Sequence, residues 1–244
     1  MIENEFTYDF YKQMIQLAKS KGYSFSFYGE KPIDKTIILR HDIDSDIKKA
    51  LALAKIEHQL GVKSTYFVLL RTDFYNPFSK ESLEMLLKII SLGHEVGLHF
   101  DEKSYEEDCD IVDEVKNEVK LLSMLINKPV RVVSMHRPSR KTLDANYRFD
   151  YIINSYSQEY FNNYKYISDS RRNWRENPFE VIESGLYNKL HILTHAFWYH
   201  KDTSNIKNDI KNFIIDGKKD RYLSLMSNIT NLSDIVEYSE VINE

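Results

Sequence analysis

Short apolar segments alternate along this chain with longer segments whose apolar residues recur at a helical period. Strands are expected at residues 36–42, 64–70, 94–100, 130–136 and 190–198, and helices at 6–22, 46–61, 79–93 and 104–127. Parallel strands need a helix or a similar crossover between them, because the chain must return to the same end of the sheet before each new strand. The pattern therefore predicts an α/β protein with a parallel sheet and helices outside it.

The remaining segments are less regular. Short strands are expected at 151–156 and 164–169, and the stretch 201–244 is expected to be mostly helical. A chain of 244 residues is long enough for one α/β domain. We therefore expect a single domain over 1–244, with a core at about 35–200, an extra N-terminal helix and a helical extension at 201–244.

Composition and charge exclude several classes of function. The net charge is −4 and no run of Lys or Arg stands out, so we expect no nucleic-acid partner. No apolar run reaches the roughly 18 residues of a membrane span, and the N-terminus lacks the basic and apolar regions of a signal peptide. Cys109 is the only cysteine, which excludes an intrachain disulfide and a thiolate metal cluster. We expect a soluble, cytoplasmic protein.

Two aspartates stand at the end of the first long strand. Asp42 and Asp44 are two residues apart, so their side chains leave an extended chain on the same side. Neighbouring carboxylates repel each other, which raises the pKa of one of them unless a cation lies beside them. A divalent ion held by one aspartate relieves this repulsion and leaves the other free to take a proton. The alternative is that Asp44 or Asp46 caps the helix that follows.

Three histidines also stand at strand ends, namely His99, His136 and His195. In an (α/β) barrel such ends gather around one mouth, so these residues favour an incomplete or irregular barrel over an open sheet. Histidine is the commonest ligand for a metal such as zinc, although a single histidine is more often a hydrogen-bonded core residue. The spacing of His94 and His99 excludes the helical zincin motif, in which two histidines are four residues apart.

Two further features adjoin these strand ends. Pro138 restricts Arg137 to an extended or turn conformation, from which Arg137 is expected to pair with a carboxylate such as Asp42; an ordinary surface arginine is the alternative. Aromatic residues follow His195, and they either wedge the strand against the next helix or form a stacking wall for a sugar ring: Phe197, Trp198 and Tyr199. No spacing argument fixes the reaction type.

The order of the motifs "HDID", "GHEVGLH", "HRPS" and "LTH" resembles the polysaccharide deacetylase family, which is carbohydrate esterase family 4 or the NodB-homology domain. In particular it resembles a cytoplasmic-looking branch encoded with surface-glycan biosynthesis. The resemblance covers about residues 35–199. It implies an irregular (β/α) barrel with about seven strands. It also implies removal of N- or O-acetyl groups from sugars with one divalent metal, most often Zn²⁺, with Co²⁺, Ni²⁺ and Mn²⁺ as alternatives.

The resemblance also implies roles for individual residues. Asp42 resembles the general base and Asp44 a metal ligand, and His99 resembles the histidine that binds the same metal. Arg137 resembles the arginine that orients the catalytic carboxylate, and His195 resembles the histidine that protonates the leaving group. Two more residues resemble, more loosely, the motif that supports this histidine: Asp169 and Trp174.

One departure from the family pattern leaves the ligand set incomplete. The family's second metal-binding histidine follows the first by four residues, and Lys103 stands at that position. His136 is the first choice for the third ligand, because imidazole then replaces imidazole. Asp101 is the second choice, and His195 is the third because metal binding would remove it from its acid role.

The expected function is a metal-dependent deacetylase whose partner is an acetylated sugar. Since the protein is expected in the cytoplasm, the substrate is expected to be a nucleotide- or lipid-linked precursor of a surface polysaccharide. A related amide hydrolase is one alternative, and a metal-free glycan-binding pseudoenzyme is the other, for which Lys103 is the main argument. The sequence leaves the oligomeric state open.

Overall fold

The computed structural model describes residues 5–242. The chain divides into two compact units, the first ending at Lys201 and the second beginning at Asp202, and each is described by itself. The single domain expected over 1–244 stays a prediction, and residues 1–4 and 243–244 at its two ends lie outside the described residues.

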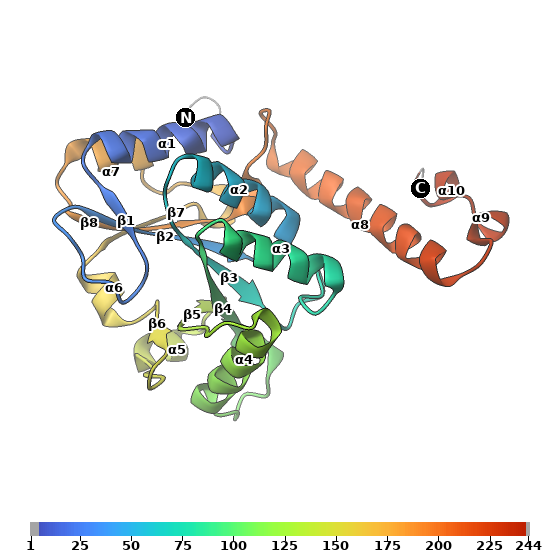
Figure 1. The fold of residues 1–244 in the computed structure, drawn as a ribbon, viewed down its shortest axis with the longest axis horizontal. Helices are drawn as coiled ribbons and strands as arrows, with labels where there is room; N and C mark the ends of the chain where they lie inside the picture. The colour runs from blue at the N-terminus through green and yellow to red at the C-terminus, as the bar shows by residue number, and fades with distance from the viewer. Residues whose placement is uncertain (1–4, 243–244) are drawn as a thin grey trace. The chain divides into compact units, whose positions relative to one another are not determined.

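The first unit is built on a parallel sheet (Figure 1). Its strands follow the order β6-β5-β4-β3-β2-β8-β7, and β1 pairs with β2 beside this path. Every ladder between these strands is parallel. The α/β fold predicted from the sequence, with about seven strands in an irregular (β/α) barrel, is therefore confirmed. The bounds are β1 Ser24–Ser26, β2 Thr36–Ile43, β3 Thr65–Leu69, β4 Glu95–Asp101, β5 Val132–His136, β6 Ile153–Asn154, β7 Lys165–Ser168 and β8 Lys189–Thr194.

Helices connect the strands, and the long ones begin at side chains that accept a backbone N–H: Thr7, Asp46, Ser79 and Asp110. Of the two caps considered for the helix after the first strand, Asp44 and Asp46, the structure shows Asp46. The helix expected at 104–127 begins later, at Ile111, because Asp110 caps it there. The bounds are α1 Tyr8–Ser20, α2 Ile47–Gln59, α3 Lys80–Ser91, α4 Ile111–Ile126, α5 Arg140–Ala145, α6 Gln158–Asn162 and α7 Pro178–Ser184.

The two faces of the sheet bury different residues. Side chains alternate between the faces along each strand, and the register of the ladders shows which positions share a face. The outer face carries mainly aliphatic and aromatic side chains, which pack with the helices into the main core. The inner face carries a polar set that continues from strand to strand: Arg40, Asp42, His99, Ser134, His136 and His191.

The inner face also holds a small apolar cluster, to which Phe67 belongs. Gly97 lies opposite Phe67 in the β3–β4 ladder, and a Cβ atom at Gly97 would stand 2.6 Å from Cε1 of that ring. The glycine therefore lets the Phe67 ring lie against β4. The guanidinium of Arg40 stacks on the same ring at 5.3 Å from its centre. Gly97 thus sets the position of Phe67 and, through it, that of Arg40.

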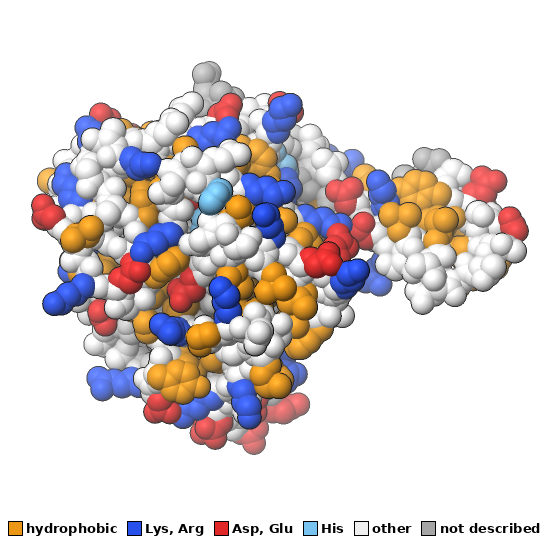
Figure 2. Space-filling model, in the orientation of Figure 1, with side chains coloured by type: hydrophobic (Ala, Val, Ile, Leu, Met, Phe, Trp, Pro, Cys, Tyr) orange, Lys and Arg blue, Asp and Glu red, His pale blue; other side chains and the backbone are white. Residues whose placement is uncertain are grey.

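The second unit is helical, with α8 Ile206–Asn228, α9 Leu232–Ile235 and α10 Tyr238–Ile242. The Tyr222 hydroxyl donates to the carbonyl of Val236, and its ring contacts that of Tyr238. On the face of the molecule drawn in Figure 2, positive and negative side chains are interspersed over the first unit. Within the described residues, no helix combines the length and the apolar character needed to cross a membrane.

The first prediction concerns Gly97. Gly97→Ala forces the Cβ atom against the Phe67 ring, so we expect the free energy of unfolding to fall by about 1–3 kcal/mol, as overpacking commonly costs. Chemical denaturation measures it. Gly217→Ala is the control, because Gly217 lies in α8 with no heavy atom within 4 Å of the added Cβ, and it should not lower stability. An unchanged stability of Gly97→Ala would show that the ring moves freely.

Candidate active site

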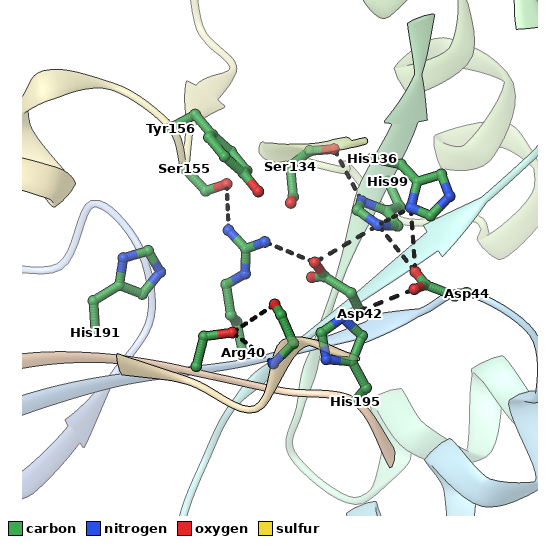
Figure 3. A network of polar contacts seen from close by, with 12 residues as sticks. Arg40, Asp42, Asp44, His99, Ser134, His136, Ser155, Tyr156, His191 and His195 are labelled. Atoms are coloured by element: carbon green, nitrogen blue, oxygen red, sulfur yellow. Dashed lines mark hydrogen bonds and ion pairs between the residues drawn. The ribbon is translucent and has the colours of Figure 1, made fainter. Parts of the chain in front are cut away.

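The carboxyl ends of four inner strands bring the predicted site residues together (Figure 3). Asp42 lies near the end of β2, and Asp44 follows that strand directly. His99 lies on β4, His136 ends β5, and His195 follows β8. Because parallel strands point the same way, their ends form one edge, and side chains far apart in sequence meet there.

Three of these side chains form a compact group of possible metal ligands. Nε2 of His99 lies 3.2 Å from Oδ1 of Asp44, and Nδ1 of His136 lies 3.4 Å from the same oxygen. The two imidazole nitrogens are 3.1 Å apart. One donor atom from each residue lies within 4.8 Å of the other two, which is a spacing that one ion can bridge.

The orientation of the His99 ring favours a cation between His99 and Asp44. Its Nδ1 lies 3.1 Å from the carbonyl oxygen of Ser134, which accepts only, so Nδ1 carries the proton. In the neutral ring, Nε2 then presents a lone pair toward the carboxylate of Asp44. That arrangement is repulsive unless a cation or a proton lies between them. Two imidazoles and one carboxylate are a donor set that suits zinc, and a backbone partner on the second ring nitrogen is usual for metal-bound histidine.

Asp42 lies beside this group without joining it. Its Oδ2 accepts a hydrogen bond from Nη2 of Arg40 at 2.7 Å and lies 3.6 Å from Nε2 of His99. Burial raises the pKa of Asp42, but the charge of Arg40 outweighs it with help from His99 and His195, so the pKa lies below its usual value. Oδ1 is buried and has no hydrogen-bond partner among the described residues. Asp42 is thus an ionised carboxylate with one free oxygen.

Arg137 pairs with a carboxylate, as expected, but the partner is Asp101 and not Asp42. Arg137 has a left-handed backbone conformation, with φ of 47°, and its guanidinium pairs with the carboxylate of Asp101. Arg40 takes the place beside Asp42, because it stands two residues earlier on the same strand and therefore faces the same side. Arg40 thus points inward beside the aspartates at the end of β2.

The same pairing decides against Asp101 as the third metal ligand. Asp101 accepts from Arg137 and from the backbone N–H of Lys103, and the group of possible ligands among the described residues does not include it. The acidic residue after it, Glu102, binds the backbone N–H of Ser139 and the hydroxyl of Thr142. The loop after β5 is thereby tied to the end of β4, which fixes His136 beside His99.

His195 forms a separate proton-carrying pair with Asp169. Its Nδ1 lies 2.6 Å from Oδ1 of Asp169, and its backbone N–H donates to the same carboxylate. Burial lowers the pKa of His195, but Asp169 outweighs it and Asp44 adds to the effect, so the pKa rises to about 9. His195 is therefore protonated at neutral pH, as an acid must be. Nε2 lies 3.8 Å from Oδ2 of Asp44.

The residues expected near His195 divide into two groups. Asp169 contacts it as the motif implies, whereas Trp174 is buried in the main core, and no described contact joins Trp174 to His195. The aromatic residues after His195 lie in the 3₁₀ helix η3, Ala196–Trp198, or directly after it. Tyr199 is fully buried and packs against Tyr11. It therefore serves packing rather than stacking on a ligand.

Comparison with known proteins finds similar chains among solved structures. No protein-family model matches the sequence, and no curated protein does. The deacetylase PplD of Streptococcus pyogenes is 18% identical, with 59% of this chain and 69% of that chain covered and a TM-score of 0.45. A family 4 carbohydrate esterase from Bacillus anthracis is 17% identical, with 81% and 82% covered and a TM-score of 0.44.

A further Bacillus anthracis structure, described as a CE4 family pseudoenzyme, is 16% identical, with a TM-score of 0.45. The similarity covers 78% of this chain and 63% of that chain, so it spans less than two thirds of the pseudoenzyme.

The second prediction concerns the pKa of His195. Asp169→Asn removes the negative charge that holds the proton, so the pKa should fall from about 9 toward the ordinary 6.5. A pH titration of the imidazole signals by NMR measures it. Because the pKa is raised in the folded state, the stabilisation by this pair is fully present below about pH 6.5 and is lost as the pH rises through about 9. A pKa that stays near 9 in the variant would contradict the assignment to Asp169.

Proposed function

We propose that this protein is a metal-dependent deacetylase that hydrolyses an N-acetyl or O-acetyl group on a sugar. The observation that carries the proposal is the grouping of Asp44, His99 and His136 within 4.8 Å, beside the free oxygen of Asp42 and the protonated His195. A structural ion-pair network needs no carboxylate oxygen left unpaired and no acid of raised pKa at the same edge. A hydrolase needs both.

Asp44, His99 and His136 would hold the divalent ion, with Zn²⁺ as the first choice. When bound, the ion supplies Lewis acidity that polarises an acyl carbonyl and lowers the pKa of water. Asp42 then takes a proton from the attacking water on Oδ1, because Oδ2 is bound by Arg40. His195 donates a proton to the departing sugar nitrogen or oxygen, and Asp169 holds its ring in the required orientation. The products are acetate and the free sugar amine or hydroxyl.

We also propose that the substrate is a nucleotide- or lipid-linked precursor of a surface polysaccharide, handled in the cytoplasm. The support is the branch of the family that the motifs resemble. Cell fractionation that finds the protein outside the cytoplasm would overturn this part of the proposal. A purified precursor tested against a finished polymer separates the two substrate classes directly.

Lys103 keeps a second function open, that of a metal-free glycan-binding pseudoenzyme. It stands where the family places a metal-binding histidine. His136 can replace this missing histidine, because it supplies an imidazole from the neighbouring strand next to His99. Metal analysis of the purified protein separates the two functions: less than one ion per chain, with no activity after addition of zinc, cobalt or nickel, favours the pseudoenzyme. Acetate measured against formate and ammonia separates a deacetylase from a related amide hydrolase.

The third prediction tests the base. Asp42→Asn keeps the size of the side chain and its bond to Arg40 but removes the proton acceptor, so kcat should fall by about 10²–10⁴, the usual worth of general base catalysis. Metal content, measured by mass spectrometry of the purified variant, should stay unchanged because Asp42 is outside the ligand group. Loss of the metal together with the activity would mean that Asp42 and Asp44 have exchanged roles.

The fourth prediction tests the third ligand. His136→Ala should weaken metal affinity by more than about 100-fold, since even an outer partner of a ligand is typically worth about 10–100-fold. Competition with a chromophoric chelator measures the affinity. Lys103→Ala is the matched control, because Lys103 stands at the family's ligand position but outside the group found here, and its affinity should not change. An unchanged affinity in His136→Ala would transfer the role to His195.

A further inference from the structure

A pair of polar side chains lies behind the candidate active site, on the outer face of the sheet. The last two residues that β2 and β8 place opposite each other are His41 and Thr194, and both are fully buried. The earlier outward pairs of the same ladder are apolar and belong to the main core: Ile37 with Leu190 and Leu39 with Ile192. The ladder thus becomes polar on its outer face at the end that carries the site.

A hydrogen bond joins the two side chains of this pair, and a buried carboxylate sets its direction. Nε2 of His41 lies 2.8 Å from Oε1 of Glu57, whose ionised carboxylate only accepts, so Nε2 carries a proton. In the neutral ring Nδ1 then accepts, and the Thr194 hydroxyl donates to it at 2.6 Å. The His41 ring also packs on that of Tyr66, with 4.4 Å between the ring centres. The ring therefore has one position from which it can bind Thr194.

Glu57 is itself held by several donors. Besides His41, three hydroxyl groups donate to its carboxylate, those of Tyr11, Ser64 and Tyr66. Stability alone does not explain such a network, because well-packed apolar residues in place of buried ionic groups are often equally stable or more stable. A buried polar network does, however, fix the side chains that belong to it in one arrangement. The structure next to the network shows what this arrangement serves.

Each residue of the polar pair directly precedes a proposed proton carrier. Asp42 follows His41 in the chain. His195 follows Thr194, and both proton carriers turn to the inner face (Figure 3). The ladder ends at the polar pair, because the backbone N–H of His195 donates to Asp169 instead of to β2. Of the contacts in this ladder, the hydrogen bond between the two side chains is therefore the one nearest to the acid and the base.

We propose that Thr194 is a positioning residue, whose hydrogen bond to His41 holds the acid His195 in place relative to the base Asp42. The inference rests on the proposed function, since it takes these two residues to transfer the protons of a hydrolysis. Thr194 points away from the site, so it acts through His195 and not on the substrate. Misplacement of a catalytic group by about 1 Å can cost on the order of 10²-fold in rate, so one hydrogen bond behind the strand is enough to affect turnover.

Thr194→Val tests the inference, because valine keeps the size and branching of the side chain and removes only the hydroxyl. The metal-loaded variant and wild type are compared on UDP-N-acetylglucosamine and on p-nitrophenyl acetate. The sugar nitrogen must be protonated as it leaves, whereas p-nitrophenolate leaves as an anion. We expect kcat for the sugar to fall by about 10- to 100-fold, with KM unchanged and kcat for the ester nearly unchanged. Thr194→Ser, which keeps the hydroxyl, should restore kcat.

Thr36→Val is the matched control. Thr36 is equally buried, lies at the other end of the same ladder and donates its hydroxyl to the carbonyl of Ile33. Each valine variant loses one buried hydrogen bond, so both should lower stability to a similar extent, but Thr36→Val should leave turnover of both compounds unchanged. Equal losses on the two compounds in Thr194→Val, no loss on the sugar, or no recovery in Thr194→Ser overturns the inference.

A spectroscopic measurement decides the inference without turnover. Nδ1 of His195 and Oδ1 of Asp169 are 2.6 Å apart, and the proton of such a short hydrogen bond gives a low-field NMR signal, which Asp169→Asn identifies. Thr194→Val should shift or broaden this signal, and Thr36→Val should not. A signal that does not move in Thr194→Val overturns the inference. If the metal-loaded wild type releases acetate from neither compound, the proposed function fails, and this signal alone decides the role of Thr194.

Discussion

A buried pair of opposite charges, Arg40 and Asp42, holds the candidate active site together. Their atoms are 2.7 Å apart, with Arg40 fully buried and Asp42 5% exposed. Burial of two such charges is costly, and loss of one partner typically costs about 3–5 kcal/mol because the other charge is then left unpaired. The desolvation of this pair serves the site, because the charge of Arg40 lowers the pKa of Asp42 and keeps its carboxylate ionised. The guanidinium also contacts the rings of Phe67 and Tyr156, so the position of the proposed base depends on how these rings pack around Arg40.

The possible metal ligands come from three strands rather than from one motif. A histidine four residues after His99 would have been held by the local chain alone. His136 instead depends on the pairing of β4 with β5, in which Asp101 is opposite His136. Two consecutive acidic residues strengthen that pairing, since Asp101 binds Arg137 and Glu102 binds the backbone of Ser139. The proposed metal site is therefore coupled to the register of the sheet.

The sequence predicted the fold class and most of the site for a physical reason: parallel strands present their carboxyl ends together, so any strand-end residue is a candidate. It placed Asp44, His99 and His136 in one group, as the structure does. It misassigned Arg137, because the direction of a side chain in a turn depends on φ and on a partner across the sheet, here Asp101. It also gave no role to Tyr156, whose ring lies 5.2 Å from the guanidinium of Arg40. Tyr156 lies in a short, irregular stretch that has no period to read, and the contact forms only in three dimensions.

The register of β2 decides whether this site exists at all, because a slip of one residue would turn Arg40 and Asp42 to the outer face. His41 opposes such a slip. It points outward, where its ring contacts the hydroxyl of Thr194 at 2.6 Å and the carboxylate of Glu57 at 2.8 Å. Burial raises the pKa of Glu57, but His41 and its other partners lower it to about 2, so the carboxylate stays charged. Three hydroxyl groups also donate hydrogen bonds to the carboxylate of Glu57, those of Tyr11, Ser64 and Tyr66. The Glu57 carboxylate has so many partners that only one position is favourable for it. Because His41 on β2 contacts both Glu57 on α2 and Thr194 on β8, it fixes β2 relative to these two elements. The outer network thus sets the position of the inner ion pair.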